Sequence, residues 1–247
     1  MSNHIVSALK YRPNKFDDVV GQDAITHTLN NAIQHNKLAH AYLFCGPRGV
    51  GKTSCARIFA KLVNEGVDTT DQDFAFNIFE LDAASNNSVD GIRQLIDQVR
   101  IQPQVGTYKI YIIDEVHMLS QSAFNAFLKT LEEPPPHAIF ILATTEKHKV
   151  LPTIISRCQV YDFSRITVKD IADHLTKVAQ KENIEAEHEA LHLIAQKADG
   201  ALRDALSIFD QIVNFSDGSI TYDQVIENLH LLDYDQYLAL ADMIAKG

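Results

Sequence analysis

Two stretches of the sequence combine residues that can bind and cleave a chain of phosphates. The first, residues 46–53, reads Gly-Pro-Arg-Gly-Val-Gly-Lys-Thr and fits the phosphate-binding pattern G-x-x-x-x-G-K-[ST]. Its glycines let backbone N–H groups turn toward an anion, Lys52 can reach the β- and γ-phosphates, and the Thr53 hydroxyl can hold Mg²⁺. An apolar run at 41–45 precedes it and helical apolar spacing over 54–63 follows it, a context that disfavours a chance glycine-rich turn.

The second stretch is an apolar strand, residues 108–115, that ends in two carboxylates. Ligands bind at the carboxyl ends of strands in a parallel sheet, so we expect these acids to face the phosphates. Asp114 can complete the Mg²⁺ shell, and Glu115 can orient and polarise the attacking water. An acidic turn without a role is the alternative, and the phosphate loop upstream disfavours it.

Two other segments can take part, but their residue types leave a purely structural role open. A buried strand at 137–143 ends in Thr144-Thr145, where a hydroxyl can hold the nucleophilic water or sense the γ-phosphate. Threonine is also a common strand residue, so both interpretations stand. Residues 4–20 mix aromatic residues, proline and glycine without a period. They form either an arm that wraps the nucleotide base or, as composition alone favours, a plain N-terminal arm.

The composition limits the classes of protein to which the chain can belong. Of 247 residues, 46% are hydrophobic and 22% are charged, as in ordinary globular proteins. No apolar run approaches ~18 residues, so we expect no membrane partner, and we see no secretory signal. Three cysteines (Cys45, Cys55 and Cys158) without metal-ligand spacing favour a reducing, cytoplasmic location. The net charge of −10 disfavours a generally basic nucleic-acid binder but leaves a local DNA-binding patch open.

The character of the sequence changes near residue 165. Before it, strand-like and helical segments alternate, which predicts an α/β fold with a five-stranded parallel sheet. After it, helices follow one another over 168–182, 187–198, 201–214, 222–230 and 234–245, which predicts a small all-α domain. We therefore expect three parts, at 1–165, 166–228 and 229–247, the last being the start of a further helical domain.

Longer strings of residues resemble one protein family. They include Asp18-Val19-Val20-Gly21-Gln22, Ile113-Asp114-Glu115-Val116-His117, Leu142-Ala143-Thr144-Thr145, Ile155-Ser156-Arg157-Cys158 and Gly200-Ala201-Leu202-Arg203-Asp204-Ala205. Spread over nearly the whole chain, they resemble the gamma/tau subunits of bacterial DNA polymerase III, the ATPase motors of the sliding-clamp loader. The resemblance implies an AAA+ P-loop NTPase fold, ATP and Mg²⁺ as cofactors, and a helical lid as the second domain.

The resemblance also assigns roles to single residues. Arg157 matches the arginine finger, which acts on ATP held by a neighbouring subunit. A planar, permanently charged guanidinium suits charge that spreads over phosphate oxygens. Arg203 matches the sensor 2 arginine, which reaches the γ-phosphate from the lid, and Thr145 matches sensor 1, with Thr144 as the second choice. Without the resemblance, Arg157 would be taken for a surface arginine at the start of a strand.

Several sets of residues match the functional contacts of the family. The catalytic set is Lys52, Asp114, Glu115, Thr145, Arg157 and Arg203, with Thr53 and Asp114 as the Mg²⁺ ligands. The adenine is expected against Tyr11, Arg12, Pro13, Val19 and Val20. The nucleotide's phosphates are expected against Pro47, Arg48, Gly49, Val50, Gly51, Lys52, Thr53, Ser54 and Arg203.

The sequence departs from the family at two places. The zinc module of the family carries four cysteines, whereas the corresponding stretch 64–70 has none, so we expect no zinc site. The family continues into a collar domain that assembles the ring, whereas this sequence stops at the first helix of that domain. We therefore expect the chain alone to be monomeric.

The resemblance implies a function and partners. We expect the ATP-hydrolysing motor of a clamp loader, which works with delta, delta-prime and further gamma/tau subunits to load the sliding clamp onto primer-template DNA. The DNA-contact hypothesis rests on a helix start at Asn86, Asn87, Ser88 and Arg93, which an exposed polar helix start explains nearly as well.

Two alternative functions stay open. One is a stator-like clamp-loader subunit that does not hydrolyse ATP, against which the intact Lys52-Thr53 and Asp114-Glu115 count. The other is a different AAA+ DNA machine, such as a branch-migration motor. That function needs a pore-translocating loop and a winged DNA-binding domain, and we find neither in the sequence.

Overall fold

A computed structural model describes residues 5–64, 77–85, 89–104, 106–216, 218–229 and 244. The chain forms two compact units. One is Pro13–Arg165, and the other combines the residues up to Arg12 with those from Ile166 onward. The sequence placed residues 1–165 together, so the structure differs from that expectation at the N-terminal arm, which belongs to the helical unit.

The first unit is built on a five-stranded sheet with the strand order β2-β3-β4-β1-β5. All neighbouring strands are parallel, which confirms the predicted α/β fold with a five-stranded parallel sheet. The strands are β1 (Ala41–Cys45), β2 (Ile78–Asp82), β3 (Lys109–Asp114), β4 (Ala138–Thr144) and β5 (Gln159–Asp162). In the register, Cys45 is opposite Thr144 and Asp82 is opposite Asp114, so the carboxyl ends of the strands form one edge of the sheet.

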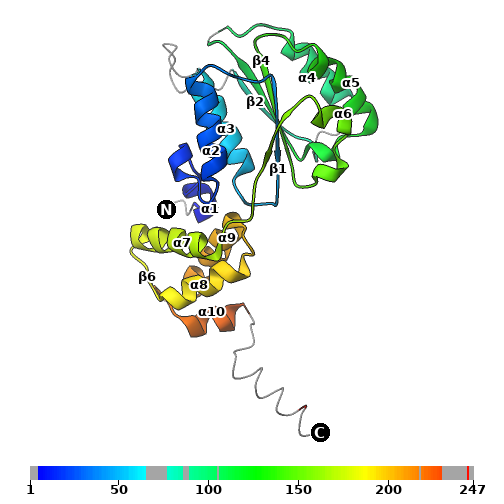
Figure 1. The fold of residues 1–247 in the computed structure, drawn as a ribbon. Coiled ribbons are helices and arrows are strands. Elements are labelled where there is room, and N and C mark those ends of the chain that lie inside the picture. Colours follow the sequence, from blue (N-terminus) through cyan, green and yellow to red (C-terminus); the bar gives the residue numbers. More distant parts are fainter. Residues whose placement is uncertain are drawn as a thin grey trace. The chain divides into compact units, whose positions relative to one another are not determined.

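Helices cover both faces of this sheet (Figure 1). The longer ones are α2 (Asp23–Gln34), α3 (Lys52–Asn64), α4 (Val89–Val99) and α5 (Gln121–Glu132). Short turns of helix are η1 (Phe16–Asp18), η3 (Val116–Met118), η4 (Lys147–Lys149) and α6 (Pro152–Ile155). Strands covered on both faces need apolar side chains at every position, and every residue of β1 and β4 is buried.

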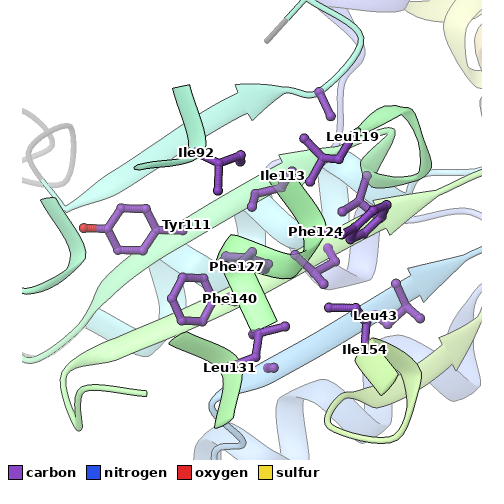
Figure 2. Packing of buried hydrophobic residues seen from close by; sticks show 14 of the residues in the cluster. Leu43, Ile92, Tyr111, Ile113, Leu119, Phe124, Phe127, Leu131, Phe140 and Ile154 are labelled. Carbon is purple, nitrogen blue, oxygen red and sulfur yellow. The ribbon is translucent and has the colours of Figure 1, made fainter. Parts of the chain in front are cut away.

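The two faces of the sheet carry separate apolar cores. On β1, Leu43 belongs to the core under α4, α5 and α6, whereas Tyr42 and Phe44 belong to the core under α2 and α3. Figure 2 shows the first core, where the rings of Phe127 and Phe140 meet edge to face with centroids 5.1 Å apart. Each such buried side chain contributes about 2–3 kcal/mol, so the sheet is a rigid support for residues at its edges.

The second unit is mainly helical. Its longer helices are α7 (Val168–Glu182), α8 (His188–Lys197), α9 (Leu202–Phe215) and α10 (Tyr222–Asn228). The Thr167 hydroxyl accepts the Asp170 N–H at 3.1 Å, which caps the start of α7. The unit also contains a short parallel pair, β6 (Glu185–Ala186) with β7 (Ser219–Ile220). Apart from Leu229 and Ile244, the expected part 229–247 lies outside the described residues.

The N-terminal arm belongs to the helical unit because polar contacts hold it there. Helix α1 (Ser7–Lys10) packs on α9, and the Ser7 N–H donates to Asp210 Oδ2 at 2.7 Å. Lys10 and the Tyr11 hydroxyl both donate to Glu182 of α7. Such contacts between distant residues have no signature in local sequence.

Within the described residues, no helix has the length and apolar character to cross a membrane.

Candidate active site

The phosphate loop connects β1 to α3 and depends on its glycines. Gly46 has φ +144°, and a Cβ there would lie 2.4 Å from the carbonyl oxygen of Phe163, closer than van der Waals contact allows. Gly51 has φ +105°, which other residues rarely adopt. Within the described part of the chain, the N–H groups of residues 48–51 donate no hydrogen bond. The loop therefore offers a row of free donors at a helix N-terminus, as an anion site requires.

Lys52 holds a positive charge inside this loop. Its ammonium donates to the carbonyl oxygens of Gly46 and Pro47, at 2.8 and 2.7 Å, and the residue is only 6% exposed. Burial lowers the pKa of Lys52, and the nearby carboxylates of Glu115 and Asp114 partly oppose that shift. A phosphate anion in the loop would compensate the buried charge directly.

Thr53 and Asp114 meet across the gap between the phosphate loop and β3. The Thr53 hydroxyl donates to Asp114 Oδ2 at 2.7 Å, and the Glu115 N–H donates to Asp114 Oδ1 at 2.9 Å. A hydroxyl and a carboxylate beside a phosphate loop form an oxygen donor set of the kind that Mg²⁺ prefers. These residues therefore fit the Mg²⁺ role predicted for them.

Glu115 lies next to Asp114 with a left-handed backbone, at φ +48°. Its Oε2 accepts hydrogen bonds from the Thr145 N–H at 3.3 Å and the Thr145 hydroxyl at 3.0 Å. The buried Thr144 instead contacts His117, with its Oγ1 3.0 Å from the ring Nδ1. Of the two threonines, Thr145 is therefore the one that the structure brings to Glu115.

Arg157 lies at the opposite edge of the same sheet. It precedes β5, whose first residue pairs with the start of β1, whereas the phosphate loop follows the end of β1. The guanidinium donates to the Thr153 carbonyl oxygen at 2.6 Å and to Glu132 Oε1 at 2.7 Å. It borders a cavity of about 470 Å³, lined also by Ala39, His40, Ala41, Leu131, Glu132, Pro134 and Gln159. The structure does not bring Arg157 to Lys52.

The residues expected around adenine are divided between the two units. Val19 and Val20 belong to the α/β unit, where a Cβ on Gly51 would lie 3.7 Å from Val19 Cγ1, so Val19 adjoins the phosphate loop. Pro13 begins that unit. Tyr11 and Arg12 belong to the helical unit, and the Tyr11 ring lies under the ammonium groups of two lysines.

Three other predictions concern residues near or beyond the described ranges. Arg203 is exposed in the first turn of α9, where its side chain forms no hydrogen bond or ion pair with any described residue. In the DNA-contact hypothesis, Arg93 lies 3.4 Å from Asp90, and residues 86–88 are outside the described ranges. Residues 65–70, which are most of the stretch that corresponds to the zinc module of the family, also lie outside the described ranges. In the described ranges, no cluster of three His, Cys, Asp or Glu side chains is arranged to hold a metal ion.

Two residues at the site were not singled out from the sequence. His117 follows Glu115 by two positions, and Glu146 follows Thr145. The His117 ring lies 3.4 Å from Glu115 Oε2 through Nδ1 and 3.3 Å from Glu146 Oε1 through Nε2. His117 stands within one of the family-like strings, but its spacing alone does not show that it reaches β4.

Comparison with known proteins agrees with this geometry. A family profile described as DNA polymerase III, delta subunit, matches residues 21–167, and one described as DNA polymerase III clamp loader subunit, ATPase lid domain, matches residues 170–218. The DNA polymerase III subunit tau of Bacillus subtilis (strain 168) is 54% identical over 219 residues, covering 83% of this chain and 39% of that protein. The chain thus spans well under two thirds of that relative.

A shorter relative is matched over most of its length. The DNA polymerase III subunit gamma of Buchnera aphidicola subsp. Acyrthosiphon pisum (strain APS) is 35% identical, covering 99% of this chain and 71% of that protein. Among solved structures, the Thermotoga maritima RuvB Holliday junction branch migration motor has a TM-score of 0.70 at 21% identity, covering 89% of this chain and 72% of that one, which shows a shared AAA+ fold alone. Because the clamp-loader lid profile matches and a gamma subunit is 35% identical over 71% of its length, the chain belongs to the gamma/tau family of DNA polymerase III clamp-loader subunits.

Proposed function

We propose that this chain is the ATP-hydrolysing motor region of a clamp loader, which uses ATP binding and hydrolysis to load a sliding clamp onto primed DNA. One observation carries the proposal. Lys52 and Thr53 of the phosphate loop meet Asp114 and Glu115 at one edge of the sheet, with Thr53 and Asp114 joined by a hydrogen bond of 2.7 Å. Binding and hydrolysing a nucleoside triphosphate need these groups together.

Each residue of the set has a separate task. The free N–H groups of the loop and the Lys52 ammonium bind the phosphates of ATP, and Thr53 and Asp114 hold Mg²⁺. The ion supplies charge neutralisation on the phosphate oxygens. Glu115 orients and polarises the attacking water, and Thr145 fixes the Glu115 carboxylate through two hydrogen bonds.

Arg157 completes the site of a neighbouring subunit in this proposal. The four-residue β5 spans roughly 13 Å, and Arg157 precedes it, at the edge away from the phosphate loop. An arginine at that edge is remote from its own phosphate site, but a second subunit can receive it. The finger would stabilise the charge of the transition state, which in related NTPases is worth roughly 10³–10⁵ in rate.

The remaining assignments also follow the family. Arg203 serves as sensor 2 toward the γ-phosphate, and the adenine binds against Tyr11, Arg12, Pro13, Val19 and Val20. The partners are delta, delta-prime and further gamma/tau subunits, together with the sliding clamp and primer-template DNA, in the cytoplasm. Support comes from the names of the matched relatives, which are subunits of DNA polymerase III.

ATP binding and turnover by the purified chain test the proposal, with Lys52→Ala alongside. We expect the wild-type chain to bind ATP and turn it over slowly, because no neighbour supplies Arg157. Lys52→Ala should lose binding, whereas Lys149→Ala, which removes an exposed lysine that pairs with Glu146 at 2.8 Å, should keep it. A wild-type chain that binds no ATP would favour the stator-like alternative.

The branch-migration alternative rests on fold alone. RuvB shares the architecture at 21% identity, a level at which function does not transfer. Stimulation of ATP turnover distinguishes the two functions. A clamp-loader motor responds to a sliding clamp with primed DNA, whereas a branch-migration motor responds to four-way DNA junctions.

A further inference from the structure

The proposed mechanism does not use His117, whose side chain is buried. His117 lies in η3, two residues after Glu115, and its side chain is only 6% exposed. Its Nδ1 lies 3.0 Å from Thr144 Oγ1, and its Nε2 lies 3.3 Å from Glu146 Oε1. The ring is therefore tied to the residues on both sides of Thr145.

The hydrogen bonds of Thr144 define the state of this ring. Thr144 is fully buried, and its Oγ1 already accepts the Glu146 N–H at 3.0 Å. The hydroxyl proton needs an acceptor, because a buried donor left unpaired is destabilising, and His117 Nδ1 is within reach. The ring then carries its proton on Nε2 and donates it to Glu146. Lys149 holds the pKa of the Glu146 carboxyl below its usual range, so that acceptor is ionised.

The contacts of His117 with Thr144 and Glu146 hold the segment that carries Glu115. Glu115 has a left-handed backbone, a conformation that is unfavourable outside glycine and needs support from its surroundings. Its Oε2 is held by Thr145. His117 Nδ1 lies 3.4 Å from that oxygen, but it accepts the Thr144 hydroxyl and has no proton to donate, so His117 acts on Glu115 through the backbone of η3. Fixing η3 against residues 144–146 therefore fixes where the Glu115 carboxylate meets Thr145.

We infer that His117 is a positioning residue for ATP hydrolysis, which braces the segment carrying Glu115 against the segment carrying Thr145 so that the Glu115 carboxylate keeps one orientation. The inference rests on the proposed ATPase function. Within the described residues, the hydrogen-bond partners of His117 include no residue of the phosphate loop. Loss of the brace should therefore slow the chemical step and leave ATP binding intact.

The test is steady-state ATP turnover by the full-length protein assembled with its partner subunits, clamp and primed DNA. His117→Ala should lower kcat roughly 10- to 100-fold, the effect expected of a displaced reacting group, while KM for ATP stays within about twofold. His148→Ala is the matched control. His148 also lies near Glu146, at 3.6 Å, but it is 76% exposed, and its loss should change neither constant.

Two further comparisons show whether His117 acts through Glu115. If it does, His117→Ala should cost nothing more once Glu115→Gln has removed the carboxylate. His117→Asn keeps an acceptor near the position of Nδ1 and should restore part of kcat. That rescue should disappear with Thr144→Val, which lacks the hydroxyl donor. If His117→Ala fails to fold, kcat of His117→Asn, measured with and without Thr144→Val, decides whether His117 acts as a positioning residue.

The outcomes separate this inference from the proposed function. Turnover that is the same in His117→Ala and wild type overturns the inference alone. A lower melting temperature with unchanged kcat also overturns it, because His117 would then be a structural core residue only. Absence of ATP turnover by the wild-type assembly would overturn the proposed function and this inference with it.

Discussion

The two edges of the sheet in the α/β unit differ in how their functional residues are held. At the carboxyl edge, Lys52, Thr53, Asp114 and Glu115 are joined to one another or to the loop by hydrogen bonds, and Lys52 is buried. At the amino edge, Arg157 is partly exposed and paired with Glu132, itself about half exposed. One edge is a preformed site, whereas the other offers a charged group to its surroundings.

In our proposal this difference reflects how ATP hydrolysis is divided between neighbouring subunits. A group that binds its own nucleotide must be positioned before the ligand arrives, which explains the buried and connected carboxyl edge. A group that serves a neighbour must remain accessible until that neighbour docks. In our proposal the same sheet therefore carries two half-sites, and each pairs with the complementary half of another subunit.

Removal of the Arg157 side chain should give the largest effect, and it tests whether this residue serves a neighbouring subunit. Arg157→Ala should lower ATP turnover of the assembled complex roughly 10³- to 10⁵-fold, because transition-state charge on the neighbour's phosphate loses its partner. The slow turnover of the isolated chain should not change, since no neighbour receives the finger there. Single-turnover hydrolysis measures both, with Arg100→Ala, an exposed arginine directly after α4, as the control. An equal loss in the isolated chain would place Arg157 in its own site and contradict the comparison.

At the carboxyl edge, Gly46 lies so close to Phe163 that a larger residue cannot replace it without strain. Gly46→Ala should destabilise the protein by about 2–4 kcal/mol, because φ is +144° and the new Cβ would meet the Phe163 carbonyl oxygen at 2.4 Å. Gly218→Ala is a matched control, with φ +99° and open space, and should cost only about 1 kcal/mol. Urea unfolding measures both, and equal losses would show that the contact with Phe163 is unimportant.

The sequence predicted the frame of this site well. Continuous apolar runs identified β1, β3 and β4 because both faces of the sheet are covered there, and the glycine pattern identified the loop because backbone geometry demands it. The helical spacing likewise predicted a helix over 168–182, the range of α7. These features are local, and local sequence determines them.

Features that depend on tertiary contact were not predictable in the same way. Thr144 and Thr145 are adjacent and identical in type, but only Thr145 reaches Glu115, because the chain leaves β4 between them. The contact of His117 with Thr144 of β4 joins residues 27 positions apart. The four-residue α1 has no apolar period, and side-chain contacts with α7 and α9 hold the arm.

Burial of Lys52 gives the carboxyl edge a dependence on pH. Burial lowers the pKa of Lys52 in the folded state, so between that pKa and the usual value near 10.5 the unfolded chain binds more protons. Relative to Lys52→Met, the wild type should therefore gain stability as pH rises from neutral toward 10.5, seen as a rise in Tm. Thermal unfolding of both proteins across this range measures it. A difference independent of pH would show that burial does not disfavour the charged form.

The ion pair at the amino edge gives the smallest expected effect. In our proposal Glu132 competes with a neighbour's phosphates for the Arg157 guanidinium, and a surface pair of this kind is worth about 0–1 kcal/mol. Glu132→Gln should therefore lower the partner concentration needed for half-maximal ATP turnover, by up to about fivefold. Salt should reduce the effect, because it screens exposed charges. Glu133→Gln is the neighbouring control. A decrease in maximal turnover would instead mean that Glu132 aims the finger, and the amino edge would then be preorganised like the carboxyl edge.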